Sequence, residues 1–540
     1  MKKTIQKLMA VLLAAAMVCA MAIPAFAYHT TEDINKDHSF KAFQIFRGDV
    51  EGNKISNADW GQSIADDSTN FLAQLKNDTT LRDEFKDATT VQDVLAVIST
   101  WNNSDDNSIA FARFVCHYLY PTANANPTHA AIGNHTLHFN DAGYYLIVDV
   151  TDFSNGDSYV AYNSFMLTVT QANWDVDVTP KVEKPTVEKE VHDNDNNDIS
   201  SAGNNDGWGS SADHAINEKF QFRLIAKLPA SDAHVYDYYD KYTVCFTDTL
   251  SKGITFDNLD KVEIANVDGG NPQVINADNY TRNPNGSQSF KLSIDNVKTC
   301  ARAANLDLNQ GATITVTYTA HLNENAYVNT ATNGDTKNTN KVYLTYSNNP
   351  RINTSVGQTP ESEVYVFTYQ LNNTKYRDEV NENNKLAGAG FRLYSDAACN
   401  DTDEIKLKKN TTDGTYSRYF GDEAGEQMFS DDKGQFNVKG LDAGTYYLKE
   451  TTTPTGFNTC PVTTVVIKAN HTENNVDLTG STINGEGVGA SGLSTTIVNK
   501  QGTTLPSTGG MGTTLFYVIG GGLMVAAIVL LVTKKRMENK

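Results

Sequence analysis

The chain has 540 residues, of which 39% are hydrophobic and 20% are charged, and its formal net charge at pH 7 is -20. This length predicts roughly three domains once the processed ends are removed. Because phosphates would be repelled by so acidic a chain, its charge argues against nucleic acid or an anionic membrane surface as a partner.

The N-terminus has the pattern of a secretory signal peptide. Three lysines precede an apolar stretch over residues 8–23, and Ala25 and Ala27 supply the small residues of a cleavage site. We therefore expect residues 1–27 to be removed and the mature chain to begin near Tyr28, outside the membrane.

Residues 28–180 are predicted to form a first β-domain with a helical insertion. Strand-like segments lie at residues 40–46 and 165–170. Two helices with N-cap residues are expected between these strands: 91–98 after Thr90 and 109–119 after Ser108.

Two further β-domains are expected over residues 181–357 and 358–500. Apolar and polar residues alternate in segments such as 314–318, and Gly and Asn mark the turns. Short alternating strands at this spacing favour immunoglobulin-like sandwiches. The predicted fold class is therefore mainly β, with three sandwich domains in tandem between a signal peptide and a C-terminal transmembrane helix.

An internal repeat relates the first and third domains. Residues 141–146 (DAGYYL) are similar to residues 442–448 (DAGTYYL). Aligned on Tyr-Tyr-Leu, Val148 falls opposite Glu450, and Asp149 is one step away and faces the other side of the sheet. The alignment predicts that the first domain lacks an acid at the position of Glu450.

Five cysteines remain after signal-peptide removal, in an exported setting that permits oxidation. Cys399 and Cys460 lie in polar, loop-like sequence of one domain, and a disulfide is predicted between them. Cys245 and Cys300 could pair within the middle domain. Cys116 has no neighbouring partner and is expected to be a buried free thiol.

The sequence predicts neither a metal site nor a cofactor site. The acidic run at residues 192–198 begins with the spacing of an EF-hand loop, but Asp198 stands where Gly is needed and Asn204 where the closing Glu should be. A solvated loop is the preferred interpretation. No Cys/His spacing is typical of zinc.

The C-terminal segment, residues 501–540, carries an ordered set of motifs. They are Leu505-Pro506-Ser507-Thr508-Gly509, an apolar run from Leu515 to Thr533, and Lys534-Lys535-Arg536. This order resembles the cell-wall sorting signal of Gram-positive surface proteins. The resemblance implies that a sortase cysteine cuts between Thr508 and Gly509 and passes the Thr carbonyl to an amine.

The third domain resembles a collagen-adhesin B-type domain through residues 386–394 and 447–450. The resemblance implies an autocatalytic isopeptide bond between Lys375 and Asn499, with Glu450 as the acid. The chemistry requires burial, because a Lys amine attacks only when it is neutral. A buried carboxyl stays protonated and can shuttle a proton as ammonia leaves.

The middle domain resembles the fimbrial isopeptide-forming domain through residues 186–191, 246–250 and 340–348. The resemblance implies a bond between Lys189 and Asn340 with Asp248 as the acid, and Asn329 remains a competing acceptor. No such bond is predicted in the first domain.

The boundary of the first two domains resembles a pilin motif. Residues 174–181 read WDVDVTPK, and the resemblance implies that Lys181 attacks the sortase-bound Thr of another subunit. The preceding Pro180 fixes an extended backbone that presents the lysine. Lys184 is the alternative nucleophile.

Nearly the whole chain resembles a sortase-assembled backbone pilin of a Gram-positive bacterium, a structural protein rather than an enzyme. Its implied partners are a pilin-specific sortase, further copies of itself, peptidoglycan through a housekeeping sortase, and tip and basal pilins. The expected location is the cell wall or a surface pilus. The alternatives are a monomeric LPxTG wall-anchored adhesin and a basal or tip pilin.

Overall fold

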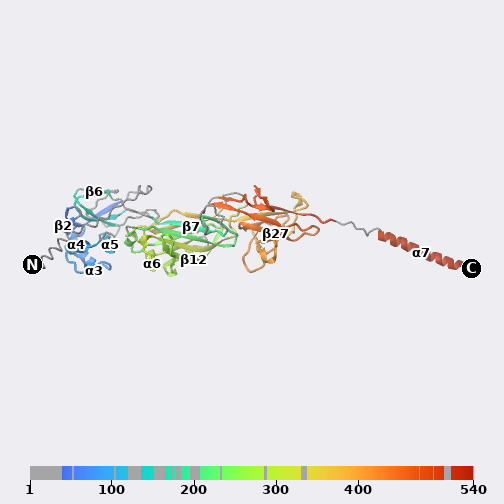
Figure 1. Cartoon of the computed structure of the whole chain (residues 1–540), viewed down its shortest axis with the longest axis horizontal. Helices are drawn as coiled ribbons and strands as arrows, with labels where there is room; N and C mark the ends of the chain where they lie inside the picture. The colour runs from blue at the N-terminus through green and yellow to red at the C-terminus, as the bar shows by residue number, and fades with distance from the viewer. Residues whose placement is uncertain are drawn as a thin grey trace.

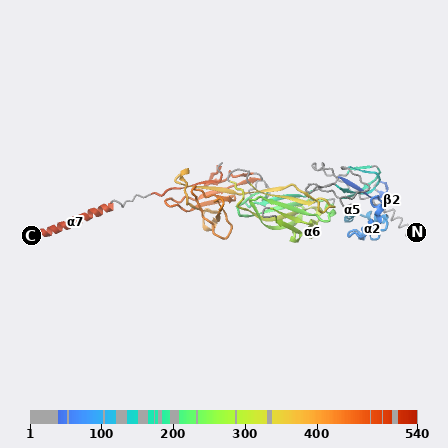
Figure 2. The same cartoon turned by 180° about the vertical axis from the view of Figure 1, so that it is seen from behind.

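Three β-rich units follow one another along the long axis of this computed structural model, and a single helix, α7 (Gly512–Glu538), extends beyond them (Figure 1). The view from behind has the same order, with the first unit and α7 at opposite ends (Figure 2). The structure describes residues 39–51, 54–101, 105–119, 136–150, 164–172, 174–177, 184–194, 207–231, 234–284, 289–329, 337–472, 475–489, 492–503 and 512–538. The predicted signal peptide lies outside the described residues.

The first unit is built on a four-stranded sheet of order β2-β1-β4-β5, with a β3-β6 ribbon. Its strands are β1 (Phe40–Glu51), β2 (Lys54–Trp60), β3 (Thr136–Phe139), β4 (Gly143–Asp149), β5 (Phe165–Val169) and β6 (Trp174–Asp177). Its helices are η1 (Ala65–Asp67), α2 (Ser68–Leu75), α3 (Arg82–Phe85), α4 (Val91–Ile98) and α5 (Asp106–Leu119).

Both faces of this sheet are covered, so every residue of β4 is buried. Tyr144, Leu146 and Val148 join the core under the helices, whereas Tyr145 and Ile147 pack beneath the β3-β6 ribbon. The period of two along a strand produces this division.

The helical insertion is present, with one correction at a helix start. Thr90 caps α4 in a reciprocal capping box with Asp93, as predicted. Helix α5 begins at Asp106, so Ser108 is a buried residue of its first turn and does not cap it. Helices α2 and α3 were not predicted.

The middle unit is a sandwich of two sheets, of order β13-β12-β16-β10-β7-β8 and β14-β15-β11-β17-β19-β9, with β18 beside β17. Its strands are β7 (Thr186–His192), β8 (Trp208–Gly209), β9 (Ser211–Asp213), β10 (Lys219–Leu228), β11 (Val244–Leu250), β12 (Ile254–Asn266), β13 (Gln273–Val274), β14 (Tyr280–Pro284), β15 (Ser289–Ile294), β16 (Ala312–Leu322), β17 (Asn338–Ser347), β18 (Val356–Gln358) and β19 (Ser362–Phe367). Its helices are η2 (Val235–Tyr238), η3 (Ala277–Asn279), α6 (Val297–Ala303) and η4 (Leu308–Gln310).

The boundary between the second and third domains lies after strand β19, later in the sequence than expected. It pairs antiparallel with β17 and parallel with β9, so it completes a sheet of the middle unit. The sequence assigned these residues to the third domain, but only Thr368 separates β19 from the first strand of that domain.

The third unit is also a two-sheet sandwich, of order β23-β24-β26-β20-β33 and β22-β21-β27-β28-β31-β32, with β25 beside β21 and a separate β29-β30 pair. Its strands are β20 (Tyr369–Arg377), β21 (Gly390–Tyr394), β22 (Glu404–Ile405), β23 (Leu407–Lys409), β24 (Tyr416–Arg418), β25 (Met428–Phe429), β26 (Val438–Leu441), β27 (Gly444–Thr452), β28 (Thr463–Ile467), β29 (Asn470–Thr472), β30 (Asn475–Asp477), β31 (Thr482–Ile483), β32 (Glu486–Gly487) and β33 (Ser494–Asn499). It also contains the short helices η5 (Glu382–Asn384) and η6 (Asp401–Asp403).

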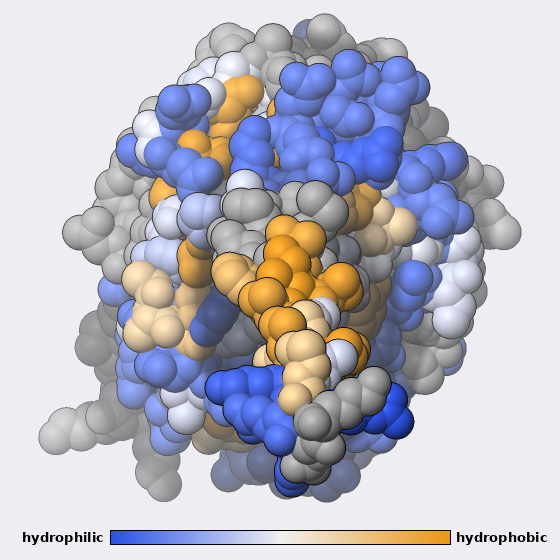
Figure 3. Space-filling model, turned by 90° about the vertical axis from the view of Figure 1, so that its right-hand side faces the viewer, coloured by the Kyte–Doolittle hydropathy of each residue, from blue (hydrophilic) through white to orange (hydrophobic). Residues whose placement is uncertain are grey.

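The C-terminal helix has the length and composition of a membrane span. The segment Leu515–Glu538 contains an 18-residue stretch with a mean hydropathy of 2.6, and its side chains pack against no other part of the described chain. Viewed from the C-terminal end, apolar surface stands in front of the more hydrophilic body (Figure 3).

The internal repeat has a different structural register from its sequence alignment. Tyr145 donates a hydrogen bond to the carbonyl of Asp141 at 2.8 Å, and Tyr446 donates one to the carbonyl of Asp442 at 2.9 Å. These matching corners place Asp149, which is buried, opposite Glu450. The first domain therefore has an acid in register, contrary to the prediction, because the two corners match residue for residue, with Thr445 opposite Tyr144, and no residue is inserted between them. That this domain forms no isopeptide bond stays a prediction.

Candidate functional site

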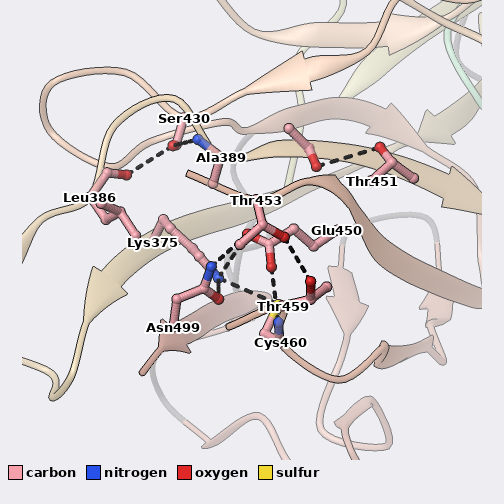
Figure 4. A network of polar contacts seen from close by, with 11 residues as sticks. Lys375, Leu386, Ala389, Ser430, Glu450, Thr451, Thr453, Thr459, Cys460 and Asn499 are labelled. Carbon is pink, nitrogen blue, oxygen red and sulfur yellow. Dashed lines mark hydrogen bonds and ion pairs between the residues drawn. The ribbon is translucent and has the colours of Figure 1, made fainter. Parts of the chain in front are cut away.

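Lys375, Glu450 and Asn499 meet in the core of the third unit (Figure 4). The Lys375 Nζ lies 2.5 Å from the Asn499 Oδ1, and the Asn499 Nδ2 donates to the Glu450 Oε1 at 2.7 Å. The Lys375 Nζ is 3.7 Å from the same carboxylate oxygen. The second oxygen of Glu450 accepts a hydrogen bond from the Cys460 backbone at 2.9 Å. The acid therefore touches both groups that would react.

Strand alternation explains how these polar residues enter the core. Along β20, Leu371 and Lys375 are buried on one face, and along β33, Ile497 and Asn499 are buried in the same way. The two strands are parallel neighbours, with Arg377 opposite Asn499. The first and last strands of the unit thus lie side by side.

The electrostatic environment favours a neutral amine. Burial lowers the pKa of Lys375, although the neighbouring Cys460 and Glu450 oppose that shift. A neutral amine can attack the Asn499 Cγ. The Nζ–Cγ bond then forms, the Cγ–Nδ2 bond breaks, and Glu450 can carry the proton from the amine to the departing ammonia.

A second cluster, also with a lysine, an acid and an asparagine, lies between the sheets of the middle unit. The Lys189 Nζ lies 2.7 Å and 2.6 Å from the two carboxylate oxygens of Asp248, and it donates to the Tyr318 hydroxyl at 3.1 Å. That hydroxyl accepts from the Asn340 Nδ2 at 2.6 Å and donates to Asp248 at 2.7 Å. Lys189 and Tyr318 come from one sheet, and Asp248 and Asn340 come from the other.

Burial again dominates the protonation of this pair. It lowers the pKa of Lys189 to about 8 and raises the pKa of Asp248, while their mutual attraction opposes both shifts. Moving one proton from Lys189 to Asp248 would produce the neutral amine and neutral acid that the reaction needs.

Tyr318 is a member of the cluster that sequence reasoning missed. It is fully buried on β16, and its hydroxyl links the amine, the acid and the amide. The competing acceptor Asn329 lies elsewhere, since its backbone bonds to Thr368 and Gln370 at the start of the third unit. The geometry therefore favours Asn340.

The predicted disulfide is wrong, because Cys399 and Cys460 are both free thiols. Cys399 follows the Tyr394 end of β21, whereas the Cys460 Sγ lies 3.4 Å from the Lys375 Nζ. The pairing of β21 with β27 places these positions toward opposite ends of the strands. Cys245 and Cys300 are also unpaired, and Cys116 is a buried free thiol as expected.

The residues predicted to join subunits lie outside the described part of the chain. Lys181 follows β6, the described start of its motif, and the pentapeptide from Leu505 to Gly509, with Thr508, precedes α7. Trp174 and Val176 on β6 pack against the core of the first unit, which fixes the start of the motif. Lys184, the alternative nucleophile, is half-buried.

Two segments of the C-terminal part of the chain match known families. Residues 370–482 match the prealbumin-like fold domain SpaA, which confirms the β-sandwich predicted for the third unit. Residues 497–539 match the LPXTG cell wall anchor motif. The chain therefore carries a sortase anchor motif behind a prealbumin-like domain, and the expected surface location of the precursor is confirmed.

Several solved pilin structures are similar to two thirds or more of the chain. The T6 backbone pilin of serotype M6 Streptococcus pyogenes is 15% identical, with 86% of this chain and 96% of that chain covered and a TM-score of 0.45. The full-length major pilin SpaD from Corynebacterium diphtheriae is 18% identical, with 67% and 77% covered and a TM-score of 0.37. The full-length major pilin RrgB from Streptococcus pneumoniae is 15% identical, with 70% and 88% covered and a TM-score of 0.39. No curated protein sequence matches.

Proposed function

We propose that the chain is the backbone subunit of a covalently polymerised surface pilus. The observation that carries the proposal is the LPXTG anchor match at residues 497–539, behind three units set end to end (Figure 1). A sortase would join Thr508 of one subunit to Lys181 of the next. Since each subunit is both acyl donor and amine acceptor, the contact repeats head to tail and builds an open filament.

The same proposal includes two internal isopeptide bonds, Lys189–Asn340 and Lys375–Asn499. The buried Lys–acid–Asn clusters support it, because each holds a nucleophile, a proton carrier and an amide in one network. Each bond forms once within the chain and releases one ammonia. The chain would therefore be a sortase substrate that also crosslinks itself, and not an enzyme with turnover.

The positions of the bonds suit a subunit under tension. In the third unit, a pull that enters at the start of β20 would cross from Lys375 to Asn499 and leave at the end of β33. Lys375 and Asn499 are 124 positions apart in the sequence (499 − 375), and the chain between them would carry little load. In the middle unit the bond would span 151 positions (340 − 189) and tie the two sheets together.

A blot of SDS-boiled cell-wall extracts tests the polymer. Wild-type cells should give a ladder of high-mass bands that collapses to monomer in Lys181→Ala and persists in Lys184→Ala, the matched control. A ladder lost only in Lys184→Ala would move the nucleophile to that residue. A single anchored band in all strains would refute the pilus and favour a wall-anchored adhesin.

A further inference from the structure

A buried cluster of three titratable side chains lies where the middle and third units meet. Asp193 follows β7 and Asp213 ends β9, both in the middle unit, whereas His471 comes from β29 of the third unit. The three side chains are at most 2% exposed. Two units therefore each contribute charge to one closed site.

The atoms of the cluster converge on a single position. The His471 Nε2 lies 3.1 Å from the Asp193 Oδ2 and 3.7 Å from the Asp213 Oδ1. One ligand atom from each of the three side chains lies within 4.8 Å of the others, close enough to surround one ion. An imidazole nitrogen and two carboxylate oxygens are ligands that zinc accepts.

Asp213 gives independent evidence for a missing partner. It is fully buried, and neither of its carboxylate oxygens has a hydrogen-bond partner. Buried carboxylates are normally paired or bound to metal, because a buried charge without a compensating partner is costly. Its ion pair with His471 is long, at 3.7 Å, and leaves both carboxylate oxygens without a hydrogen bond and able to ligate a metal ion.

The summed charge of the three side chains indicates what kind of group would bind at this site. Two carboxylates and one imidazolium leave one negative charge uncompensated, whereas two carboxylates, a neutral imidazole and a divalent cation sum to zero.

The ring is also oriented for ligation. Its other nitrogen, Nδ1, lies 2.9 Å from the Ser211 Oγ. In metal sites the non-ligating ring nitrogen is usually bonded in this way, which fixes the ring and leaves the other nitrogen's lone pair for the metal. The Phe367 ring, 5.7 Å away between centroids, forms an apolar wall.

We propose that Asp193, Asp213 and His471 bind one divalent cation of the zinc class and so fasten the middle unit to the third. A single residue, Thr368, links β19 to β20 at this junction, so a metal bridge beside it would restrict bending between the units. Because the site is closed to solvent, the ion would enter as the two units dock.

Metal content of the full-length chain in detergent tests the site. The chain is refolded with ZnCl2, dialysed against EDTA, and analysed for zinc by atomic emission. Wild type should retain one zinc per chain, His471→Ala should retain less than a tenth of that, and the melting temperature of wild type should rise when zinc is present during refolding.

Matched variants separate metal binding from folding. His138→Ala removes a histidine paired with Asp175 on the exposed β3-β6 ribbon and should keep the metal. Asp213→Asn keeps the shape of the side chain and tests the site even if His471→Ala does not fold. This variant should fold but should lose both the bound zinc and the rise in melting temperature that zinc produces. Wild type that retains no zinc, or Asp213→Asn that retains as much as wild type, would overturn the proposal and leave a metal-free ion pair.

Discussion

The substitution Glu450→Gln tests whether the Glu450 carboxyl group is needed to form the Lys375–Asn499 bond. The substitution keeps the volume of the side chain but removes the carboxylate that contacts both Asn499 and Lys375. Without a proton carrier, the Lys375–Asn499 bond should not form, and the chain should retain one ammonia that wild type loses. Intact-mass spectrometry of the purified chain measures this directly.

The stability cost follows from the length of the closed loop. The crosslink spans 124 positions (499 − 375). By analogy with a long disulfide loop, closing it stabilises the domain by about 5 kcal/mol through the unfolded chain. For a unit of roughly 130 residues, that loss lowers the melting temperature by about 15–20 °C. Calorimetry of the same sample should resolve this shift.

Two further variants make the result interpretable. Lys375→Met removes the nucleophile and should match Glu450→Gln in both ammonia retention and melting temperature. Glu404→Gln changes a partly buried glutamate of the same unit that pairs with Arg392, and it should still form the bond. If Glu450→Gln loses ammonia as wild type does, the proposed role of the acid is wrong; if wild type retains its ammonia, there is no bond.

The other predictions concern the middle unit and the cysteines. Tyr318→Phe should slow formation of the Lys189–Asn340 crosslink at least tenfold, because the hydroxyl that joins Asp248 to Asn340 is lost. The rate is measured from crosslinked tryptic peptides sampled during refolding, with Tyr346→Phe as the control. An unchanged rate in Tyr318→Phe would refute a positioning role for the hydroxyl. Mature protein denatured without reductant should titrate five thiols, since all five described cysteines are free, whereas three thiols would restore the disulfide between Cys399 and Cys460. In the native protein Cys116 should react slowly with thiol reagents even at pH 8, because burial raises the pKa of its thiol.

Strand periodicity agrees with the two clusters that the family resemblance predicts. Asp248 lies two positions from Phe246 and two from Leu250 on β11, so alternation alone places its carboxyl on the core face. Lys375 and Glu450 likewise follow Leu371 and Leu448 at even spacing. The resemblance to isopeptide-forming domains identified these residues, and the strand periods agree with their inward positions.

The sequence by itself determined the anchor segment, the β-rich character of the chain and the helix that Thr90 caps, because each depends on neighbouring residues or on a short period. Only the tertiary structure decided which distant residues meet. Tyr318 joins the Lys189 cluster from another strand, and His471 reaches Asp193 and Asp213 across a domain junction. Such contacts depend on sheet order and on the docking of units, so no local pattern of residues encodes them.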